Sequence, residues 1–450
     1  MGFLRRLFGV KHREPDSEIS ELVEASPERR VILPSARLPL PITLDILKQL
    51  FPIRNLDDDE LGAYALERKA EVCGPGSILF RAGYPIKYVH YLLEGTVVMD
   101  VGPGTRYEIG ADTAKARFPL CYGKHYTATA EAKTDVQILR VSAKIMSLGS
   151  TLTQEVPHSL DADNLDIPEA VRESSLFQAF SQHYRDDELR VPSLPEVAAR
   201  VGQAVREDIG LAEIARIVQL DPVIAARLVH IANSPLYLPS RPAVTCLDAV
   251  SRLGLLATRN LVMAFSLKQV FRCKDEDLAR IAQNHWRRSI HLSALCYVLA
   301  ADNPGMSQEE ALLAGLLADI GAVPCLYFTE NLPRTLWTPA EVEAILPLVR
   351  GPVGAYLLKR WDFPPELGII PQVAEDWYYD GGERLTLNDI VILSKLHAYI
   401  GTPQMAALPA INAIPACAKL KNHQLSPAYS LRVLHEAKDA IAQAMKFFEG

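Results

Sequence analysis

The stretch Val191–Ala249, VPSLPEVAARVGQAVREDIGLAEIARIVQLDPVIAARLVHIANSPLYLPSRPAVTCLDA, decides the fold class of the carboxy-terminal part of this chain. Its apolar residues recur at helical spacing, as Leu211, Ile214 and Val218 do. Polar and charged residues fill the positions between them. The pattern predicts short amphipathic helices that bury one face each.

The same stretch carries clear signals for where its helices begin and end. Asp221 stands directly before Pro222, and this pair is typical of an N-cap acceptor followed by a proline in the first helical turn. The helix that begins there is expected to stop at Asn233-Ser234-Pro235, because proline lacks the donor that a continuing helix needs. We expect Asp221, Pro222, Asn233 and Ser234 to have structural roles.

This order of signals resembles the HD-related output domain, HDOD. The resemblance continues in three later motifs and covers roughly half of the chain: Arg252-Leu253-Gly254, Ala314–Gly321 and Val353–Trp361. It implies an all-α, HD-like helical domain, which we place at residues 173–450, the C-terminal helices included. The later amphipathic helices are predicted at Glu309–Leu317, Val353–Trp361, Asn388–Ile400 and Tyr429–Phe448. The resemblance also implies a role in bacterial signal transduction.

Length and charge limit the other possibilities. With 450 residues the chain is expected to form about two or three domains. Its 49% apolar and 22% charged residues are typical of globular proteins. The net charge of −7 gives no electrostatic reason to expect a nucleic acid as the main partner.

Cysteine usage and hydropathy predict a cytoplasmic location. The seven cysteines are scattered without CxxC spacing, which favours reduced, buried thiols. We find no apolar run approaching the ~20 residues that span a bilayer. Met1–Arg13 combines Leu4, Leu7 and Phe8 with four basic residues, so weak membrane contact is an alternative to a solvated terminus, which we favour.

Residues 39–150 are expected to form an antiparallel β domain. Glycines and prolines separate short runs rich in strand formers, a pattern typical of a sandwich or jelly roll. The predicted strands are Ser77–Phe80, Tyr88–Leu93, Thr96–Val101, Tyr126–Ala132 and Val136–Val141. Gly76–Gly83, Tyr91–Val97 and Thr127–Ala130 resemble the cyclic-nucleotide-binding domain of bacterial regulators and kinase regulatory subunits. Residues 1–38 are predicted to be a flexible tail and residues 151–172 a linker, so the fold class is multidomain α+β.

The resemblance does not extend to the binding chemistry of that family. Its phosphate cassette presents a glutamate to the ribose and an arginine to the cyclic phosphate, because a buried phosphate needs a fixed cationic fork. Here the arginine position falls on Tyr126 and the glutamate position near Arg117. Lys124 or Arg117 is an alternative source of charge. We predict a degenerate nucleotide pocket around Arg117, Lys124 and Tyr126.

The helical domain likewise lacks the metal-ligating side chains of the enzymes that it resembles. HD-type phosphohydrolases hold metal ions with histidines and a His-Asp pair, which generate hydroxide from bound water. Ala318-Asp319 stands at the His-Asp position, Arg350 at a second histidine position, Arg288 in the segment of a third, and Glu375–Trp377 where paired histidines are usual. Arginine stays protonated and cannot bind a metal ion. We predict a vacated pocket containing Asp319, Arg288 and Arg350. His230, His397 and His435 are expected to be core or interface residues, and His285 and His291, six residues apart, to lie on different faces of a helix.

The chain is therefore expected to be a non-enzymatic regulatory protein with no metal and no cofactor. Its HDOD module would contact unknown protein partners, among them signalling enzymes, and be coupled to a degenerate sensor domain. A nucleotide second messenger remains an alternative ligand that we do not predict. Two alternative functions stay open: a metal-dependent phosphodiesterase acting on a cyclic dinucleotide, and a genuine cyclic-nucleotide sensor.

Overall fold

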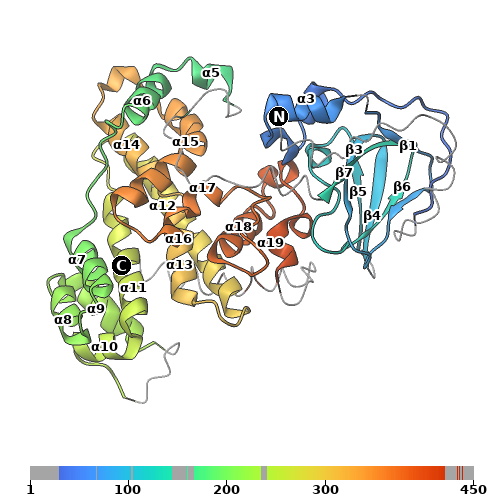
Figure 1. Cartoon of the computed structure of the whole chain (residues 1–450). Helices are drawn as coiled ribbons and strands as arrows, with labels where there is room; N and C mark the ends of the chain where they lie inside the picture. Colours follow the sequence, from blue (N-terminus) through green and yellow to red (C-terminus); the bar gives the residue numbers. More distant parts are fainter. Residues whose placement is uncertain are drawn as a thin grey trace, which may run out of the picture.

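The computed structural model describes residues 30–66, 68–102, 105–143, 160, 167–234 and 241–420, with three further positions at 433, 435 and 438. An antiparallel β domain comes first and a helical domain follows (Figure 1). The prediction of a multidomain α+β protein is confirmed. The predicted membrane contact at Met1–Arg13, most of the predicted linker and most of the predicted helix at 429–448 lie outside the described residues.

The β domain consists of two antiparallel sheets and a few short helices. One sheet has the strand order β1-β7-β3 and the other has the order β2-β6-β4-β5. The elements are α2 (Leu44–Leu47), η1 (Ile53–Asn55), α3 (Asp58–Ala65), β1 (Glu71–Cys73), β2 (Ile78–Phe80), β3 (Tyr88–Glu94), β4 (Thr96–Gly102), β5 (Thr105–Gly110), η2 (Ala114–Arg117), β6 (Thr129–Ala132) and β7 (Val136–Ser142).

Alternation along β3 gives this domain two cores. Leu92 faces the space between the two sheets, where it meets Phe80 and Met99. Val89 and Tyr91 face the other way and pack against α2 and α3. A strand buried on both faces therefore separates an inter-sheet core from a helix-covered core.

Two strands were not predicted, and one starts later than expected. β5 pairs with β4, for example Val97 opposite Ile109, but its own sequence TRYEIG carries little apolar signal. β6 begins at Thr129, although we expected strand from Tyr126. Tyr126 instead exchanges backbone hydrogen bonds with the loop before β3, donating to Tyr84 O and accepting from Gly83 N.

Residues 30–38, which the sequence places in the tail, lie along the β domain. Val31 exchanges two backbone hydrogen bonds with Ile78. Arg30 forms an ion pair with Glu71 at 2.8 Å. The segment therefore extends the edge of the sheet that contains β2.

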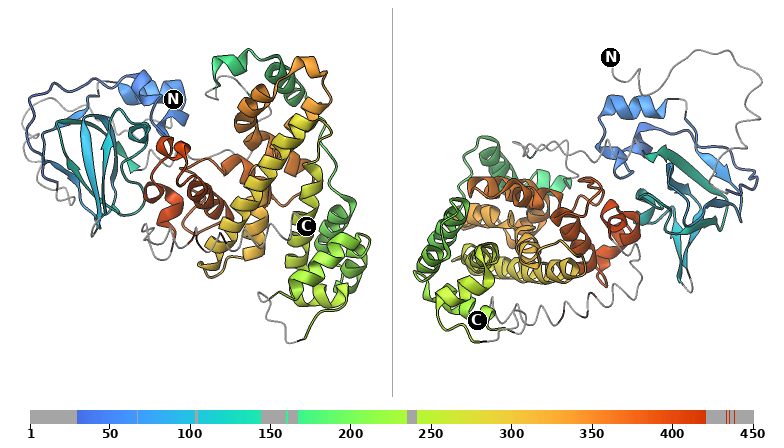
Figure 2. Two further views of the ribbon diagram at one scale, coloured as in Figure 1. Left: turned by 180° about the vertical axis from the view of Figure 1, so that it is seen from behind. Right: turned by 60° about the horizontal axis from the view of Figure 1, so that its bottom comes forward.

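The helical domain is built on a long buried helix, α12 (Glu276–Ala301), which packs against α13 (Gln308–Leu317) and α18 (Leu387–Ala398). Figure 2 shows α7–α10 as a lobe at the end far from the β domain, and α18 and α19 at the near end. The other elements are α5 (Glu169–Arg172), α6 (Ser175–Arg185), α7 (Glu196–Arg206), α8 (Leu211–Val218), α9 (Pro222–Ala232), α10 (Cys246–Leu253), α11 (Leu255–Val270), α14 (Ala322–Glu330), η4 (Arg334–Leu336), α15 (Pro339–Arg360), α16 (Pro365–Gly368), α17 (Ile370–Val373), η5 (Pro403–Ala407), η6 (Ile411–Ala413) and α19 (Pro415–Ala418).

The helix α15 is longer than the sequence predicts, because it continues through two internal prolines. We expected a helix only from Val353, since a proline inside a helix costs about 3 kcal/mol. In the structure α15 runs across Pro347 and Pro352. Ile345 and Val349 are fully buried on its inner face. Burial of this face outweighs the local cost.

The statement that no apolar run reaches the length of a membrane span is wrong by length and composition. Gln308–Glu330 is a 23-residue stretch with mean hydropathy 1.8 in its best window. In the structure α13 and α14 form this stretch and break at Asp319–Gly321, and 83% of the window is buried inside the protein. Its hydropathy is explained by a place in the core.

Candidate functional site

Asp319 lies in the turn between α13 and α14, with its carboxylate buried against two cations. Lys395 Nζ, from α18, donates hydrogen bonds to Asp319 Oδ1 at 2.7 Å and to Oδ2 at 2.9 Å. Arg350 Nε, from α15, lies 3.3 Å from Asp319 Oδ1. The structure thus brings together Asp319 and Arg350, as the sequence predicts, and adds a lysine that was not predicted.

Glu375, which follows α17, completes the group. Its Oε1 accepts hydrogen bonds from Arg350 Nη2, from Lys395 Nζ at 3.2 Å and from the Tyr399 hydroxyl at 3.1 Å. We call Asp319, Arg350, Glu375 and Lys395 the charge cluster. Two anions face two cations, so the cluster has no net charge when all four groups are ionised.

Two glycines allow the close approach that forms this cluster. A Cβ atom at Gly321 would lie 2.0 Å from the carbonyl oxygen of Arg350 and 2.5 Å from the backbone nitrogen of Gly354. A Cβ atom at Gly354 would lie 2.5 Å from Pro371 Cβ. The glycines of the two family-like motifs therefore bring the start of α14 against α15, next to Asp319 and Arg350.

The cluster stays ionised around neutral pH. Burial would raise the pKa of Asp319, but the attraction of Lys395 and Arg350 outweighs it and holds the pKa well below its usual value. The pKa of Glu375 is lowered for the same reasons. Burial and Arg350 would lower the pKa of Lys395, yet the two carboxylates raise it. Each ion is stable in the interior because its partners are present.

His285, on α12, is the imidazole next to this cluster. It is 6% exposed, and its Nδ1 has no hydrogen-bond partner among the described atoms. Burial lowers its pKa to about 4, even though Asp319 acts in the opposite direction. His285 is therefore neutral at physiological pH.

Arg288 was expected in the same pocket, but its side chain lies outside the charge cluster. The buried face of α12 carries His285, Trp286 and Ser289, whereas Arg288 is exposed. Arg288 follows His285 by three residues and lies about 60° away around the helix, at the solvent-exposed margin of that face. From there its charge still lowers the pKa of His285. Arg288 makes none of the contacts of the charge cluster.

Asp376, next to Glu375, predicts a pH dependence of stability. Burial raises the pKa of this half-buried carboxyl to about 6. Its stabilising contribution is therefore complete below about pH 4 and is lost as the pH rises through about 6. We expect Asp376→Asn, which retains an oxygen for the Tyr378 backbone N–H, to raise the free energy of unfolding at about pH 7.5 by about 2 kcal/mol and to change it little at about pH 4. Urea denaturation at both pH values measures the difference, and equal effects at both would contradict this assignment.

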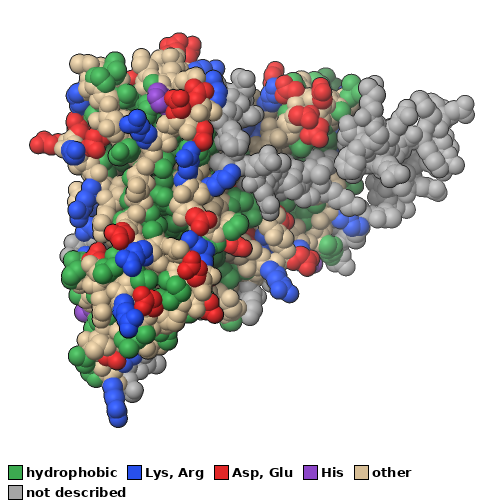
Figure 3. All heavy atoms as spheres, turned by 60° about the vertical axis from the view of Figure 1, so that its left-hand side comes forward, with side chains coloured by type: hydrophobic (Ala, Val, Ile, Leu, Met, Phe, Trp, Pro, Cys, Tyr) green, Lys and Arg blue, Asp and Glu red, His purple; other side chains and the backbone are tan. Residues whose placement is uncertain are grey.

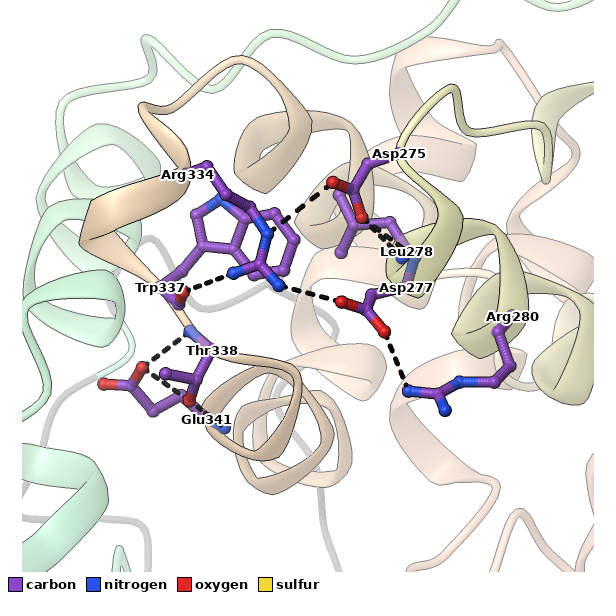
Figure 4. Close-up of polar contacts among 8 residues, drawn as sticks. All are labelled: Asp275, Asp277, Leu278, Arg280, Arg334, Trp337, Thr338 and Glu341. Carbon is purple, nitrogen blue, oxygen red and sulfur yellow. Dashed lines mark hydrogen bonds and ion pairs between the residues drawn. The ribbon is translucent and has the colours of Figure 1, made fainter.

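The helices that carry His285 and Arg350 are fastened at their N-terminal ends (Figure 4). Arg334 lies over the Trp337 ring at 4.0 Å and pairs with Asp277 at 2.8 Å and with Asp275 at 3.7 Å. Asp275 caps α12, and Thr338 with Glu341 forms a capping box at the start of α15. This network fixes α12 and α15 relative to each other outside the cluster.

The side chains around Asp319 do not fit a divalent metal ion. Its carboxylate and that of Glu375 are already engaged by an ammonium and a guanidinium group. Across the described ranges, no three His, Cys, Asp or Glu side chains are placed to hold a metal ion. A divalent ion would have to displace Lys395 and would gain one imidazole at most.

The three residues predicted around a degenerate nucleotide pocket do not converge. We call residues 113–126 the cassette segment. Arg117 is exposed at the end of η2, and Lys124 is exposed and pairs with Glu383 of the helical domain at 3.3 Å. Tyr126 is 1% exposed. No cationic fork forms between them, so the geometry lacks what a cyclic phosphate requires.

Tyr126 belongs to the core of the β domain. Its ring stacks on Phe80 at 4.2 Å between centroids, and its hydroxyl donates to Tyr88 O at 2.7 Å. His90 lies beside both rings, with centroid distances of 5.1 and 6.0 Å. Aromatic side chains therefore fill the region around the position that the resemblance assigned to the phosphate-binding arginine.

The four motif residues in the Val191–Ala249 stretch shape the backbone. Asp221 Oδ1 accepts hydrogen bonds from the N–H groups of Val223 and Ile224, and Pro222 opens α9. Asn233 ends α9 and exchanges two hydrogen bonds with the backbone of Ala243. The N–H of Ser234 donates to Ile231 O, which completes the final turn of the helix.

Two polar residues of the site, Lys395 and Tyr399, were missed in the sequence, because the search was for histidines. Glu375 was noted only as standing where paired histidines are usual, and its ion pairs with Arg350 and Lys395 were not predicted. One signal was available, because Lys395 stands in the apolar run Ile390–Leu396. A lysine inside such a run needs a buried partner of opposite charge.

Comparison with known proteins supports the helical half of this description. The HDOD domain family model matches residues 191–372. A curated, uncharacterised protein of Treponema pallidum is 23% identical over 188 residues, which is 39% of this chain and 35% of that protein. The match thus spans about a third of that relative's length.

Two solved structures are similar over more than half of the chain. A protein named "Putative metal-dependent phosphohydrolase" from Shewanella amazonensis is 27% identical, with a TM-score of 0.48, and 59% of this chain and 97% of that chain are covered. An HDOD domain protein of unknown function from Geobacter sulfurreducens is 19% identical, with a TM-score of 0.40, and the coverage is 58% and 94%.

Proposed function

We propose that this chain, whose residues 191–372 match the HDOD domain family model, is a non-enzymatic regulatory protein. One observation carries the proposal. The ammonium group of Lys395 donates hydrogen bonds to Glu375 and to Asp319, which stands at the position that the resemblance assigns to the His-Asp pair. An internal cation thus neutralises the charge that would attract a divalent ion.

We also propose that the β domain binds no cyclic nucleotide and that the protein acts in the cytoplasm. The domain's cyclic-nucleotide-binding-like sequence supplies a scaffold, while Tyr126 and Phe80 fill its interior. All seven cysteines are unpaired, and six are buried, which supports a role in a reducing cytoplasm. The β domain then acts through its surface and not through a bound nucleotide.

Protein partners are the class of ligand that the surface of the helical domain favours. On the face of the helical domain drawn in Figure 3, positive and negative side chains are interspersed with apolar ones. Leu220, Val223 and Leu256, around α8–α11, are each more than half exposed. A mixed surface with exposed aliphatic side chains is suited to protein contacts better than to a phosphate backbone.

Metal analysis combined with a turnover assay tests this proposal. The full chain is dialysed against manganese, iron(II) or zinc, freed of excess ion, and assayed with cyclic di-GMP. We expect substoichiometric metal and no hydrolysis. Stoichiometric metal together with turnover that disappears in Asp319→Asn would establish the phosphodiesterase alternative instead.

The sensor alternative requires a separate measurement. Titration calorimetry of the full chain with cyclic AMP and with cyclic GMP is expected to give no binding heat. Saturable binding that is lost in Arg117→Ala or in Lys124→Ala would identify a cyclic-nucleotide sensor and reject this part of the proposal.

A further inference from the structure

The cassette segment contacts the helical domain through aromatic rings. Phe118 stacks against Tyr378, with ring centroids 6.2 Å apart, and Tyr122 meets Tyr378 edge-on at 5.7 Å. Phe118 is 5% exposed and Tyr378 is 2% exposed. Side chains buried to this extent resemble a protein core more than a rim contact.

A polar and a close-packed contact border these rings. Lys124 pairs with Glu383 at 3.3 Å, and both side chains are largely exposed. A Cβ atom at Gly123 would lie 3.1 Å from Ala418 Cβ. The cassette segment therefore meets the residues before α18 and the end of α19, where the two domains lie side by side in Figures 1 and 2.

Within the β domain, Phe118 packs against Phe51 on the side away from Tyr378. Its ring stacks on Phe51 with a centroid distance of 5.2 Å. The carbonyl of Phe51 accepts a hydrogen bond from the Tyr91 hydroxyl at 2.8 Å, and Tyr91 belongs to β3. A hydrogen bond from β3 to Phe51, followed by two stacked ring pairs, thus connects this strand of the β domain to Tyr378.

On the other side, Tyr378 is connected to the charge cluster by a short length of chain. It follows Glu375 by three residues. Farther along, Asp380 pairs with Lys419 at 3.1 Å, and Lys419 also pairs with Asp389 at 2.9 Å. Asp389 forms the capping box of α18, the helix that carries Lys395. Residues 375–383 are therefore fixed at both ends to the cluster and to α18.

We propose that the cassette segment takes the helical domain of its own chain as its ligand, and that this contact holds Glu375 on Lys395. When Phe118 and Tyr378 are packed, the segment between α17 and α18 is fixed and the cluster is closed. When the contact opens, this segment loosens and the cluster with it. The inference rests on the proposed function, because it treats the cluster as a regulated element and not as a catalytic one.

Hydrogen exchange measured by mass spectrometry on the full chain tests the coupling across the interface. The variant Phe118→Ala alters the β domain, and exchange is recorded in helical-domain peptides covering residues 370–398. We expect exchange there to become about tenfold faster, since the loss of the ring removes a contact that opposes local opening. Unchanged exchange in these peptides would overturn the proposal.

Two matched variants separate coupling from general loss of stability. Val97→Ala truncates a fully buried β4 residue in the inter-sheet core, and it should speed exchange in the β domain alone. Tyr378→Phe keeps the ring and removes a buried hydroxyl that has no partner among the described atoms, so wild-type exchange is expected. If Val97→Ala acted on residues 370–398 as strongly as Phe118→Ala, the effect would be nonspecific and the proposal would fail.

This test is independent of the metal and turnover assays. A chain that binds metal and hydrolyses a cyclic dinucleotide would refute the proposed function, whatever the exchange data show. A metal-free, inactive chain in which Phe118→Ala left hydrogen exchange in residues 370–398 unchanged would refute the coupling alone.

Discussion

Replacing Lys395 by methionine is expected to lower the free energy of unfolding of the helical domain by about 3–5 kcal/mol. The substitution keeps the bulk of the side chain but removes the ammonium group that contacts both Asp319 and Glu375. Arg350 alone then faces two carboxylates, the buried one of Asp319 and the partly buried one of Glu375. An uncompensated buried charge is far more costly than the loss of one hydrogen bond. Urea denaturation, followed by far-UV circular dichroism, measures the change.

A double-mutant cycle shows whether charge is the cause. Asp319→Asn combined with Lys395→Met leaves one anion, Glu375, opposite one cation, Arg350, so we expect the double variant to be more stable than Lys395→Met alone. Lys359→Met, at an exposed position on α15, is the matched control and should be nearly neutral. A Lys395→Met protein as stable as Lys359→Met would show that the cluster does not hold this part of the domain together.

Gly321→Ala is expected to have an effect of similar or larger size, about 3 kcal/mol or more. The new methyl group would overlap the carbonyl oxygen of Arg350 and the backbone nitrogen of Gly354. Neither is the flexible end of a side chain, so α14 and α15 must move apart. Because Asp319 precedes α14 and Arg350 lies on α15, this separation also stretches their ion pair.

The control for this substitution is Gly368→Ala. A Cβ atom at Gly368 would have no neighbour within 4 Å, and alanine is at least as favourable as glycine in a helix. We expect this variant to be neutral or slightly stabilised in the same urea titration. Equal stabilities of Gly321→Ala and Gly368→Ala would mean that the close approach of α14 and α15 is not required.

Such a cluster fixes the relative arrangement of the helices that carry it more clearly than it raises the free energy of unfolding. A buried ion pair recovers little beyond the cost of desolvating its own charges. It is strongly directional, however, and joins α13–α14, α15, α17 and α18 at a single point. Because a small displacement of Glu375 or Lys395 leaves a charge without its partner, the cluster is sensitive to movement of the helices that carry it.

The order of domains and most local boundaries could be predicted from the sequence. Asp57 forms a capping box at the start of α3, and Asp221 with Pro222 opens α9, because these signals depend on contacts within four residues. Asp319 and Arg350 were also placed correctly in one pocket through the order of the motifs. The helix α15 was cut short, since the burial that stabilises it across Pro347 and Pro352 comes from residues distant in sequence.

By itself, the sequence determined which side chains stand at the positions that the two resemblances single out. Tyr126 and Arg350 stand where those families have an arginine and a histidine, and the identity of a side chain is a local property. Only the tertiary structure decided what surrounds these positions. Lys395 neutralises Asp319 from 76 residues away, and Phe118 packs on Tyr378 across a domain boundary. Contacts between distant residues are set by the packing of whole helices and sheets, which no periodicity along the chain encodes.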